Sequence, residues 1–152
     1  MAKWLVKSEP ESYSIDALKR DKKTVWDGVR NYQARNYLKS MAVGDELLFY
    51  HSNAEPAGVV GVAKVVKAAE PEKSQFDKKS DYYDPDSPKE NPRWFAPEIA
   101  YVRSFKAMVT LAELRGQQAL VDLVLLKRGS RLSVHPVTEA EFTAILKLAG
   151  EG

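Results

Sequence analysis

Glu46-Leu-Leu-Phe-Tyr-His-Ser-Asn-Ala-Glu-Pro-Ala-Gly-Val-Val-Gly-Val-Ala-Lys-Val-Val66 holds two apolar runs on either side of a polar turn. The first run, residues 46–51, is typical of a buried strand. The second, residues 59–66, is rich in β-branched valine, which favours extended backbone. Residues 53–58 between them contain asparagine, proline and glycine, which are common in turns. The stretch therefore predicts an antiparallel hairpin.

Shorter elements precede this hairpin. Residues 3–7 (Lys-Trp-Leu-Val-Lys) predict a first strand, which Ser8-Glu9-Pro10 ends. Ser14 is well placed to cap a short helix that runs to about residue 20, because serine is among the preferred N-cap residues. Residues 31–41 predict a second helix, which ends before Val43-Gly44-Asp45.

Prolines and charged residues dominate residues 70–93, which separate the hairpin from the C-terminal half of the chain. A loop of this length within a compact domain is usually functional or partly mobile. We expect the loop to be more mobile than the sheet or to be held down mainly by Phe76, Tyr82 and Tyr83, its large apolar side chains.

The C-terminal half predicts further helices and strands. Thr110-Leu-Ala-Glu113 and Thr138-Glu-Ala-Glu141 both have the spacing of a capping box, and each begins a predicted helix. The second of these helices is expected to end near Gly150. The remaining predicted elements are a strand at residues 98–105, a helix at residues 117–127 and a strand at residues 132–135. Because no internal repeat or domain boundary is present, residues 1–152 predict one α+β domain.

The composition restricts the class of protein. Of 152 residues, 44% are hydrophobic and 29% charged, with a net charge of +2, which permits an anionic partner without requiring one. The absence of cysteine excludes disulfides, thiol catalysis and cysteine-ligated metals. No apolar run approaches the roughly 20 residues of a membrane helix, and the N-terminal apolar run is too short for a signal peptide. We therefore expect a cytoplasmic protein without a membrane partner.

Thr24-Val-Trp-Asp-Gly-Val-Arg-Asn-Tyr-Gln-Ala-Arg-Asn36 fits neither a plain core element nor a solvated surface. A short apolar entry and a turn precede a dense set of planar, hydrogen-bonding side chains. Aromatic rings stack on bases, guanidinium groups bind phosphate, and amides read base edges. The stretch indicates recognition of a flat polar ligand, although Trp26 by itself is more often a core residue, and Arg30 and Arg35 could simply form surface ion pairs.

Three predicted strands end in polar residues, namely Lys7-Ser8-Glu9, His51-Ser52-Asn53 and Ser133-Val134-His135-Pro136. If the strands close into a barrel, these ends can gather around one mouth and form a pocket. Ordinary turns have the same composition, so the residue types alone leave both interpretations open.

Enzymatic interpretations have little support. His51, Ser52 and Asp27 supply the residue types of a hydrolytic triad, but no nucleophile-elbow motif is present. Two histidines without metal spacing do not predict a zinc site, and residues 59–61 carry no nucleotide-cofactor fingerprint. We predict no catalytic residue, metal or cofactor. A small hydrolase acting on nucleotides or modified nucleosides is the alternative.

Several short motifs occur together and in order: Trp4-Leu-Val-Lys-Ser-Glu-Pro10, Trp26-Asp-Gly-Val-Arg-Asn31, Gln33-Ala-Arg-Asn36, Gly44-Asp45, Phe49-Tyr-His-Ser52, Asn91-Pro-Arg-Trp94, Arg131-Leu-Ser-Val134 and Pro136-Val137. In these motifs the chain resembles the EVE domain family of the PUA-like superfamily, distantly related to the YTH readers of methylated adenine in RNA. The resemblance runs from about Trp4 to Leu148. It implies a PUA-like mixed β pseudo-barrel of about five to six strands with short peripheral helices.

The resemblance also implies a function, a binding module for a modified base. The ligand would be modified cytosine in DNA, with RNA or a free modified nucleotide as further options, and we expect a monomer. The implied ligand-binding residues are Lys7, Ser8, Glu9, Trp26, Arg30, Asn31, His51, Ser52, Ser133 and Val134, with Trp94 as a looser match to an aromatic cage residue. Arg30 and Arg35 would bind phosphate. One departure from the family pattern is His135, where we expect glutamine. We expect this difference to alter the ligand preference at the pocket floor.

These expectations combine into two structural predictions. A closed or nearly closed barrel should carry one cavity, bordered by Ser8, Trp26, Arg30, Ser52 and Ser133. The loop at residues 70–93 should pass near that cavity and restrict access to it, because it leads directly into Trp94.

Overall fold

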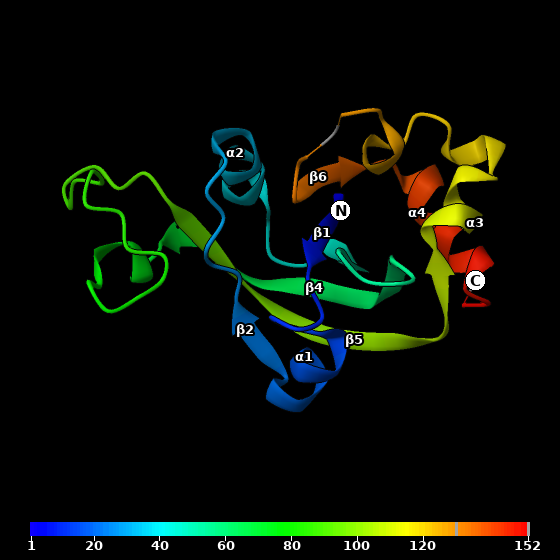
Figure 1. Ribbon diagram of the computed structural model, residues 1–152, viewed down its shortest axis with the longest axis horizontal. Coiled ribbons are helices and arrows are strands. Elements are labelled where there is room, and N and C mark those ends of the chain that lie inside the picture. Colours follow the sequence, from blue (N-terminus) through cyan, green and yellow to red (C-terminus); the bar gives the residue numbers. More distant parts are fainter. Residues whose placement is uncertain (130, 152) are drawn as a thin grey trace.

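Six strands form one mixed sheet in the computed structural model, which describes residues 1–129 and 131–151 (Figure 1). In the order β2-β5-β4-β3-β1-β6, only the β1–β3 pair is parallel. The strands are β1 (Lys3–Ser8), β2 (Lys23–Val25), β3 (Glu46–His51), β4 (Gly58–Pro71), β5 (Phe95–Thr110) and β6 (Val134–Val137). The predicted hairpin is confirmed as the antiparallel pair β3 and β4.

The expected barrel was closed or nearly closed; the sheet is curved but stays open, which corrects the closed form of that expectation. β2 and β6 lie at opposite ends of the strand order, and in the described residues they do not pair with each other. The β4–β5 ladder shifts register at four places, and such irregularities bend strands and increase their twist. The edge strands have only three and four residues, which leaves them little backbone with which to close the ring.

Four α-helices surround the sheet in the described residues: α1 (Ile15–Asp21), α2 (Tyr32–Ser40), α3 (Leu111–Arg115) and α4 (Glu139–Leu148). Each has a side-chain N-cap, Ser14, Asn31, Thr110 and Thr138 respectively. Both predicted capping boxes are complete, because each glutamate also accepts a hydrogen bond from its threonine amide.

The predicted helix at residues 117–127 is wrong. The chain forms two short 3₁₀ helices there, η2 (Gln118–Leu120) and η3 (Val124–Leu126), and neither has a side-chain cap. Leu120 and Leu123 are completely buried, whereas Val121 between them is 71% exposed. A spacing of three residues between the buried positions suits a tighter helix than the α form.

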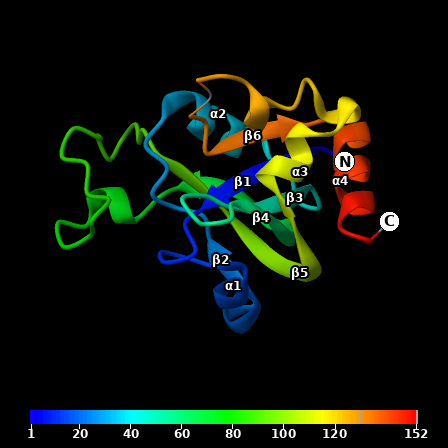
Figure 2. The ribbon, with the colours of Figure 1, turned by 45° about the vertical axis from the view of Figure 1, so that its right-hand side comes forward.

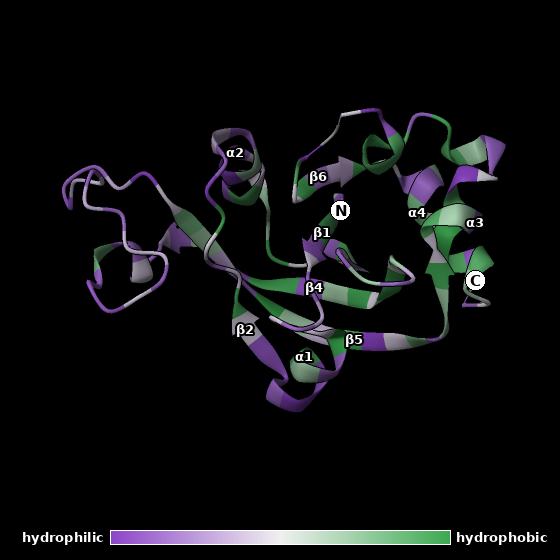
Figure 3. Cartoon of the chain, viewed as in Figure 1, coloured by the Kyte–Doolittle hydropathy of each residue, from purple (hydrophilic) through white to green (hydrophobic). Residues whose placement is uncertain are grey.

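The hydrophobic core lies on both faces of the sheet. In β1, Trp4 and Val6 pack in one buried cluster with α1 and α2, and Leu5 packs in a second cluster with α3 and α4. Side chains alternate between the faces of a strand, so a strand buried on both faces reads as a continuous apolar run. Figure 3 shows this apolar centre in green, and Figure 2 shows the helices around it.

Residues 72–94 project from one end of the molecule, between β4 and β5 (Figures 1 and 2). Buried Gln75, in the 3₁₀ helix η1 (Ser74–Phe76), holds this segment together. Its Nε2 donates to the carbonyls of Glu72 (2.6 Å) and Trp94 (2.8 Å), and its Oε1 accepts from Ser87 Oγ (2.6 Å). The base of the segment is therefore fixed by a buried polar network.

This network replaces the anchors predicted from the sequence. Tyr82 and Tyr83 are 43% and 37% exposed, and Phe76 is only partly buried. Apolar character alone could not reveal that a glutamine would be the central residue, because its partners are mostly backbone groups brought together by the fold.

No helix among the described residues has the length and apolar character needed to cross a membrane.

Candidate functional site

A cavity of about 380 Å³ opens beside the end of β1, between the turn that precedes α1 and the loop that follows β2. Its volume lies at the lower end of the range for small-ligand sites, about 300–1,000 Å³. The residues around it are Lys7, Ser8, Ser12, Tyr13, Thr24, Val25, Trp26, Asp27, Gly28, Val29, Arg30, Tyr82 and Ser133.

Five of the predicted ligand-binding residues border this cavity: Lys7, Ser8, Trp26, Arg30 and Ser133. They come from the end of β1, the loop after β2 and the residue just before β6, which are far apart in the sequence. Of the three polar strand ends that the sequence allowed to gather around one pocket, Lys7-Ser8 and Ser133 share this cavity with Trp26, and His51-Ser52-Asn53 does not.

The other predicted residues do not border the cavity, and most have a local structural partner. His51 Nε2 accepts the backbone N–H of Ile15 (3.1 Å) at the start of α1, and Ser52 donates its N–H to the Ser8 carbonyl (3.0 Å). The Asn31 side chain caps α2 by accepting from the Ala34 N–H (2.9 Å). The side chains of His51 and Asn31 thus serve the starts of α1 and α2, and the Ser52 backbone joins the ends of β1 and β3.

Glu9, Val134, His135 and Trp94 also lie outside the cavity lining. Glu9 accepts from the side chain of Asn53 (2.7 Å). Val134 and His135 are completely buried, so His135 does not form the pocket floor. Trp94 is 5% exposed and stacks on Tyr32, with ring centroids 5.1 Å apart.

Trp26 serves both the core and the cavity. Its indole meets Phe49 edge-on (5.5 Å between centroids, 80° between planes) and Tyr13 similarly (6.4 Å, 75°). It is 9% exposed and still borders the cavity. The two interpretations of Trp26 that the sequence allowed, a core residue and a wall of the pocket, are thus compatible.

Hydrogen bonds hold the polar side of the cavity in place. The Lys7 N–H donates to the Ser133 carbonyl (2.9 Å), which joins β1 to the segment before β6. Ser8 Oγ donates to the Tyr13 carbonyl (2.6 Å) and fixes the turn that carries Ser12. The polar groups of the two strand ends are therefore positioned by the backbone before any ligand binds.

Lys7 is the half-buried cation of this group. Burial lowers the pKa of its ammonium below the usual value. No carboxylate in the described part of the chain lies within 4.0 Å of it. A desolvated ammonium of this kind gains most from an acceptor supplied by a ligand.

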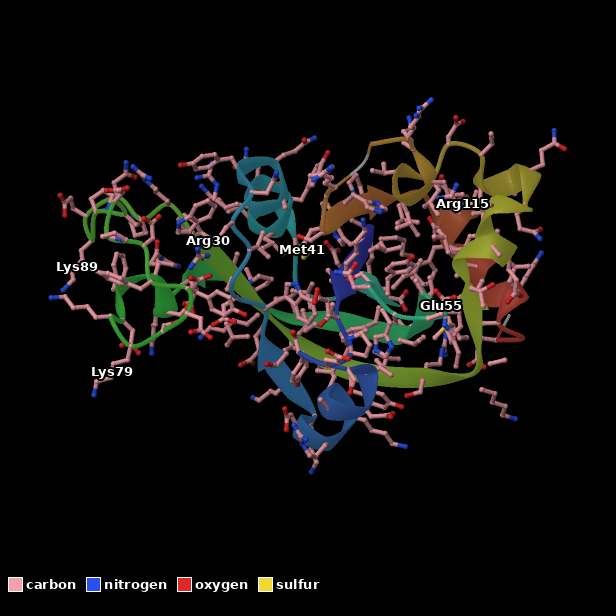
Figure 4. The ribbon with its side chains drawn as sticks, in the orientation of Figure 1. Arg30, Met41, Glu55, Lys79, Lys89 and Arg115 are labelled. Atoms are coloured by element: carbon pink, nitrogen blue, oxygen red, sulfur yellow. The ribbon has the colours of Figure 1, made fainter. Side chains whose placement is uncertain are left out.

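The opposite side of the cavity is the loop formed by residues 27–30. Gly28 has a φ of +85°, which glycine adopts without strain, and donates its N–H to Glu72 Oε2 (2.9 Å). The Arg30 guanidinium forms two hydrogen bonds to the same buried carboxylate and a third to the Tyr82 carbonyl. Figure 4 shows Arg30 where this loop meets the 72–94 segment.

Asp27 is the acidic residue among the described cavity-lining residues. Partial burial, and then the negative charge of Glu72, raise the pKa of its carboxyl, although more than a third of the residue is exposed. Its carboxylate accepts one long hydrogen bond, from Ser74 Oγ (3.3 Å). Acceptor capacity therefore remains for a ligand.

Tyr82 brings the long segment to the cavity. Its ring lies against Gly28 so closely that a Cβ built on Gly28 would come within 2.5 Å of the ring. Because Tyr82 and Trp26 border the same cavity, the segment reaches the site, as expected for a loop that restricts access.

Sequence reasoning missed Ser12, Tyr13, Thr24, Val25, Asp27, Gly28, Val29 and Tyr82 as lining residues. Those from Thr24 to Val29 lie within or beside the motif already singled out, so the signal was present. Tyr13 and Tyr82 carry no such signal, because only the fold brings them to Trp26.

Arg35, predicted to bind phosphate, is not among the cavity-lining residues. One guanidinium nitrogen donates to the Arg93 carbonyl (2.9 Å), and two others donate to the side chain of Asn36. The group also lies over the Tyr32 ring, 4.9 Å from its centroid. Arg35 and Arg30 thus both use their donors within the protein.

The arrangement offers little for catalysis or metal binding. With its Nε2 engaged by Ile15, His51 cannot act as the base toward Ser52 without leaving α1. Burial lowers the pKa of His51, which fits this neutral, accepting state. Within the described residues no group of three or more potential ligands is arranged to hold a metal ion.

Comparison with protein families matches residues 2–148 to the EVE domain. Thymocyte nuclear protein 1 from Homo sapiens is 44% identical over 164 residues, which cover 95% of this chain and 72% of the human protein. The Gallus gallus protein of that name is 41% identical, over 97% of this chain and 69% of its own length.

Solved structures agree with these sequence matches. Human THYN1 in complex with 5-methylcytosine-containing DNA superimposes with a TM-score of 0.94 at 41% identity, covering 100% of this chain and 99% of that chain. A Pseudomonas syringae protein gives 0.94 at 47% identity over 97% and 99% of the two chains. The expected α+β, PUA-like architecture is therefore confirmed, with the sheet open.

Proposed function

Because this chain belongs to the EVE domain family, we propose that it is a DNA-binding module that accepts one modified base, a modified cytosine, in the cavity beside Trp26. The observation that carries the proposal is the meeting of an indole wall with the polar ends of two strands around one cavity. The human relative, crystallised with 5-methylcytosine-containing DNA, supports the same ligand class.

The cavity can distinguish a base by shape and hydrogen bonding. Proteins that extrude a base hold it by stacking on aromatic or apolar side chains and by bonding to its edge. Trp26 supplies the aromatic wall, and Tyr82 closes the rim beside Gly28. The apolar lining, which includes Val25 and Val29, suits the added methyl group of 5-methylcytosine.

Polar groups around the cavity complement cytosine in particular. Cytosine presents an exocyclic amine, from which a carboxylate such as that of Asp27 can accept a hydrogen bond. Its carbonyl oxygen can accept a hydrogen bond from the Lys7 ammonium. The Ser133 hydroxyl can donate or accept, whereas the Ser8 hydroxyl, whose proton goes to the Tyr13 carbonyl, can accept. Thymine and uracil have a carbonyl in place of the amine, so they would face Asp27 without a donor.

We propose binding without turnover. The alternative, a nucleotide hydrolase, would need a side chain free to take a proton from a nearby nucleophile. His51 is not free in this sense, because its Nε2 accepts the Ile15 N–H at the start of α1.

The test is a binding panel on oligonucleotides of one sequence that carry cytosine, 5-methylcytosine or other modified bases, as single and double strands of DNA and RNA. We expect the tightest binding for a modified cytosine in DNA, and no new product after long incubation with excess protein. Equal affinity across the whole panel would reject the proposal, and product formation would support the hydrolase instead.

A further inference from the structure

The arginines first expected to bind phosphate are occupied within the protein. Arg30 binds the Glu72 carboxylate, which neutralises its charge, and Arg35 binds a carbonyl and an amide oxygen. The segment at residues 72–94 holds six acidic and five basic residues, so it adds no positive charge either. A DNA strand whose base enters the cavity would therefore need other cationic side chains to bind its phosphates.

A basic stretch of the sequence, which we call the basic segment, precedes Ser133 at the edge of the cavity. Lys127, Arg128 and Arg131 fall between Asp122 and Glu139 in the sequence, with no acidic residue between those two. All three basic residues are exposed. Within the described ranges, no carboxylate lies within 4.0 Å of their charged groups.

This segment leads directly to the cavity. Ser133 borders the cavity, and two residues of extended chain span at most about 7 Å, so the Arg131 backbone is close to it. The hydrogen bond from the Lys7 N–H to the Ser133 carbonyl fixes the end of the segment against β1. In Figure 1 the 72–94 segment projects on the left, away from β6, the strand that Ser133 precedes.

We propose that Lys127, Arg128 and Arg131 bind the DNA phosphates on one side of the nucleotide that enters the cavity. The inference rests on the proposed function, since it presumes a strand at that cavity. It also predicts how the DNA strand is oriented across the cavity. The DNA has its cationic contacts on the β6 side and the near-neutral 72–94 segment on the other side. These contacts carry no base information, since phosphates are the same in every sequence.

The experiment measures the dissociation constant at several salt concentrations for single strands with and without 5-methylcytosine. Arg128→Ala and Arg131→Ala are compared with Lys106→Ala and Lys147→Ala, which remove exposed cations from β5 and α4, outside the basic segment. The basic-segment variants should bind both strands more weakly by the same factor. Each lost phosphate contact should reduce the slope of log K against log salt by about 0.7.

Two further variants sharpen the comparison. Arg131→Lys keeps the charge and should retain the parent slope. Arg35→Ala should also leave it unchanged, because that guanidinium is engaged internally. Slopes for Arg128→Ala and Arg131→Ala equal to those of the lysine controls would overturn the inference, as would a loss confined to the methylated strand.

Failure of this inference can be told apart from failure of the proposed function. Preference of the parent protein for the methylated strand tests the proposed function, and the change in salt slope tests the basic segment. A parent that prefers methylated DNA with an unchanged slope in the variants would overturn only the basic-segment assignment. A parent without any preference would overturn the proposed function, and the inference that rests on it would fall as well.

Discussion

The buried carboxylate of Glu72 joins the guanidinium of Arg30 across the boundary between the cavity loop and the 72–94 segment. The Glu72 side chain is 1% exposed and the Arg30 side chain 27%. Because the same carboxylate also accepts the Gly28 N–H, it sets the position of the whole residue 27–30 loop. The shape of the cavity therefore depends on a residue that does not line it.

Glu72→Ala should destabilise the protein and loosen the 72–94 segment. Removing the carboxylate leaves the Gly28 amide without its acceptor and takes two of the acceptor contacts of the Arg30 guanidinium, which keeps its bond to the Tyr82 carbonyl. We expect this to cost about 1–3 kcal/mol of unfolding free energy. Denaturant titration measures that cost, and limited proteolysis measures the loosening. Glu70→Ala is the matched control, since Glu70 is 62% exposed in its pair with Lys67 and should change stability by less than about 1 kcal/mol. Equal effects of the two substitutions would contradict the assigned role of Glu72.

Gly28→Ala should displace Tyr82 and weaken binding. The new Cβ would meet the Tyr82 ring and would also hold alanine at a φ of +85°. Gly150→Ala is a control for the backbone effect alone, because Gly150 has a φ of +77° with no atom within 4 Å of the added Cβ. The strain alone should cost about 1–2 kcal/mol in each variant.

A double substitution separates the clash from the strain. Tyr82→Ala in the Gly28→Ala background should restore part of the lost stability, since the ring that collides is gone. If Gly28→Ala costs no more than Gly150→Ala and leaves DNA binding unchanged, Tyr82 does not form the wall described above.

Stability should fall as the pH drops below about 6.5, the ordinary histidine pKa. Burial lowers the pKa of both His51 and His135, so the folded state favours their neutral forms. The unfolded chain then binds protons first, and unfolding free energy is lost between about pH 6.5 and the lowered folded-state values. Above about pH 6.5 the two histidines do not change the unfolding free energy as the pH rises.

His51→Gln tests the share of this effect that belongs to the start of α1. Glutamine can offer the Ile15 N–H an acceptor but cannot be protonated. Denaturant titrations between pH 7 and pH 5 should show a shallower loss of stability for the variant. A variant as acid-sensitive as the parent would mean that His51 does not titrate with folding.

Local sequence signals predicted those parts of the fold that depend on neighbours in the chain. Ser14, Thr110 and Thr138 cap helices as expected, because a cap bonds a backbone amide only a few residues away. The central hairpin also follows from its own apolar runs and turn.

Long-range contacts account for what could not be predicted. His51 and Asn31 belong to conspicuous motifs, but their side chains are used by α1 and α2. Tyr82 lies at the cavity through long-range contacts: the Arg30 guanidinium binds both the Tyr82 carbonyl and the Glu72 carboxylate. The open sheet depends on strand lengths and register shifts that no single motif encodes. The proposed basic segment was likewise hidden, because its importance follows from the internal bonding of Arg30 and Arg35.

The most direct test of the account is the affinity of Trp26→Ala for a 5-methylcytosine oligonucleotide, measured beside the parent protein and Trp26→Phe. Loss of a base–aromatic stack costs about 1–3 kcal/mol, so we expect affinity to fall by roughly tenfold to a hundredfold, with a smaller loss for phenylalanine. Circular dichroism and a thermal melt must show that each variant is folded, because Trp26 also packs on Phe49. A folded Trp26→Ala protein that binds the methylated strand as tightly as the parent would contradict the central claim that this cavity receives the base.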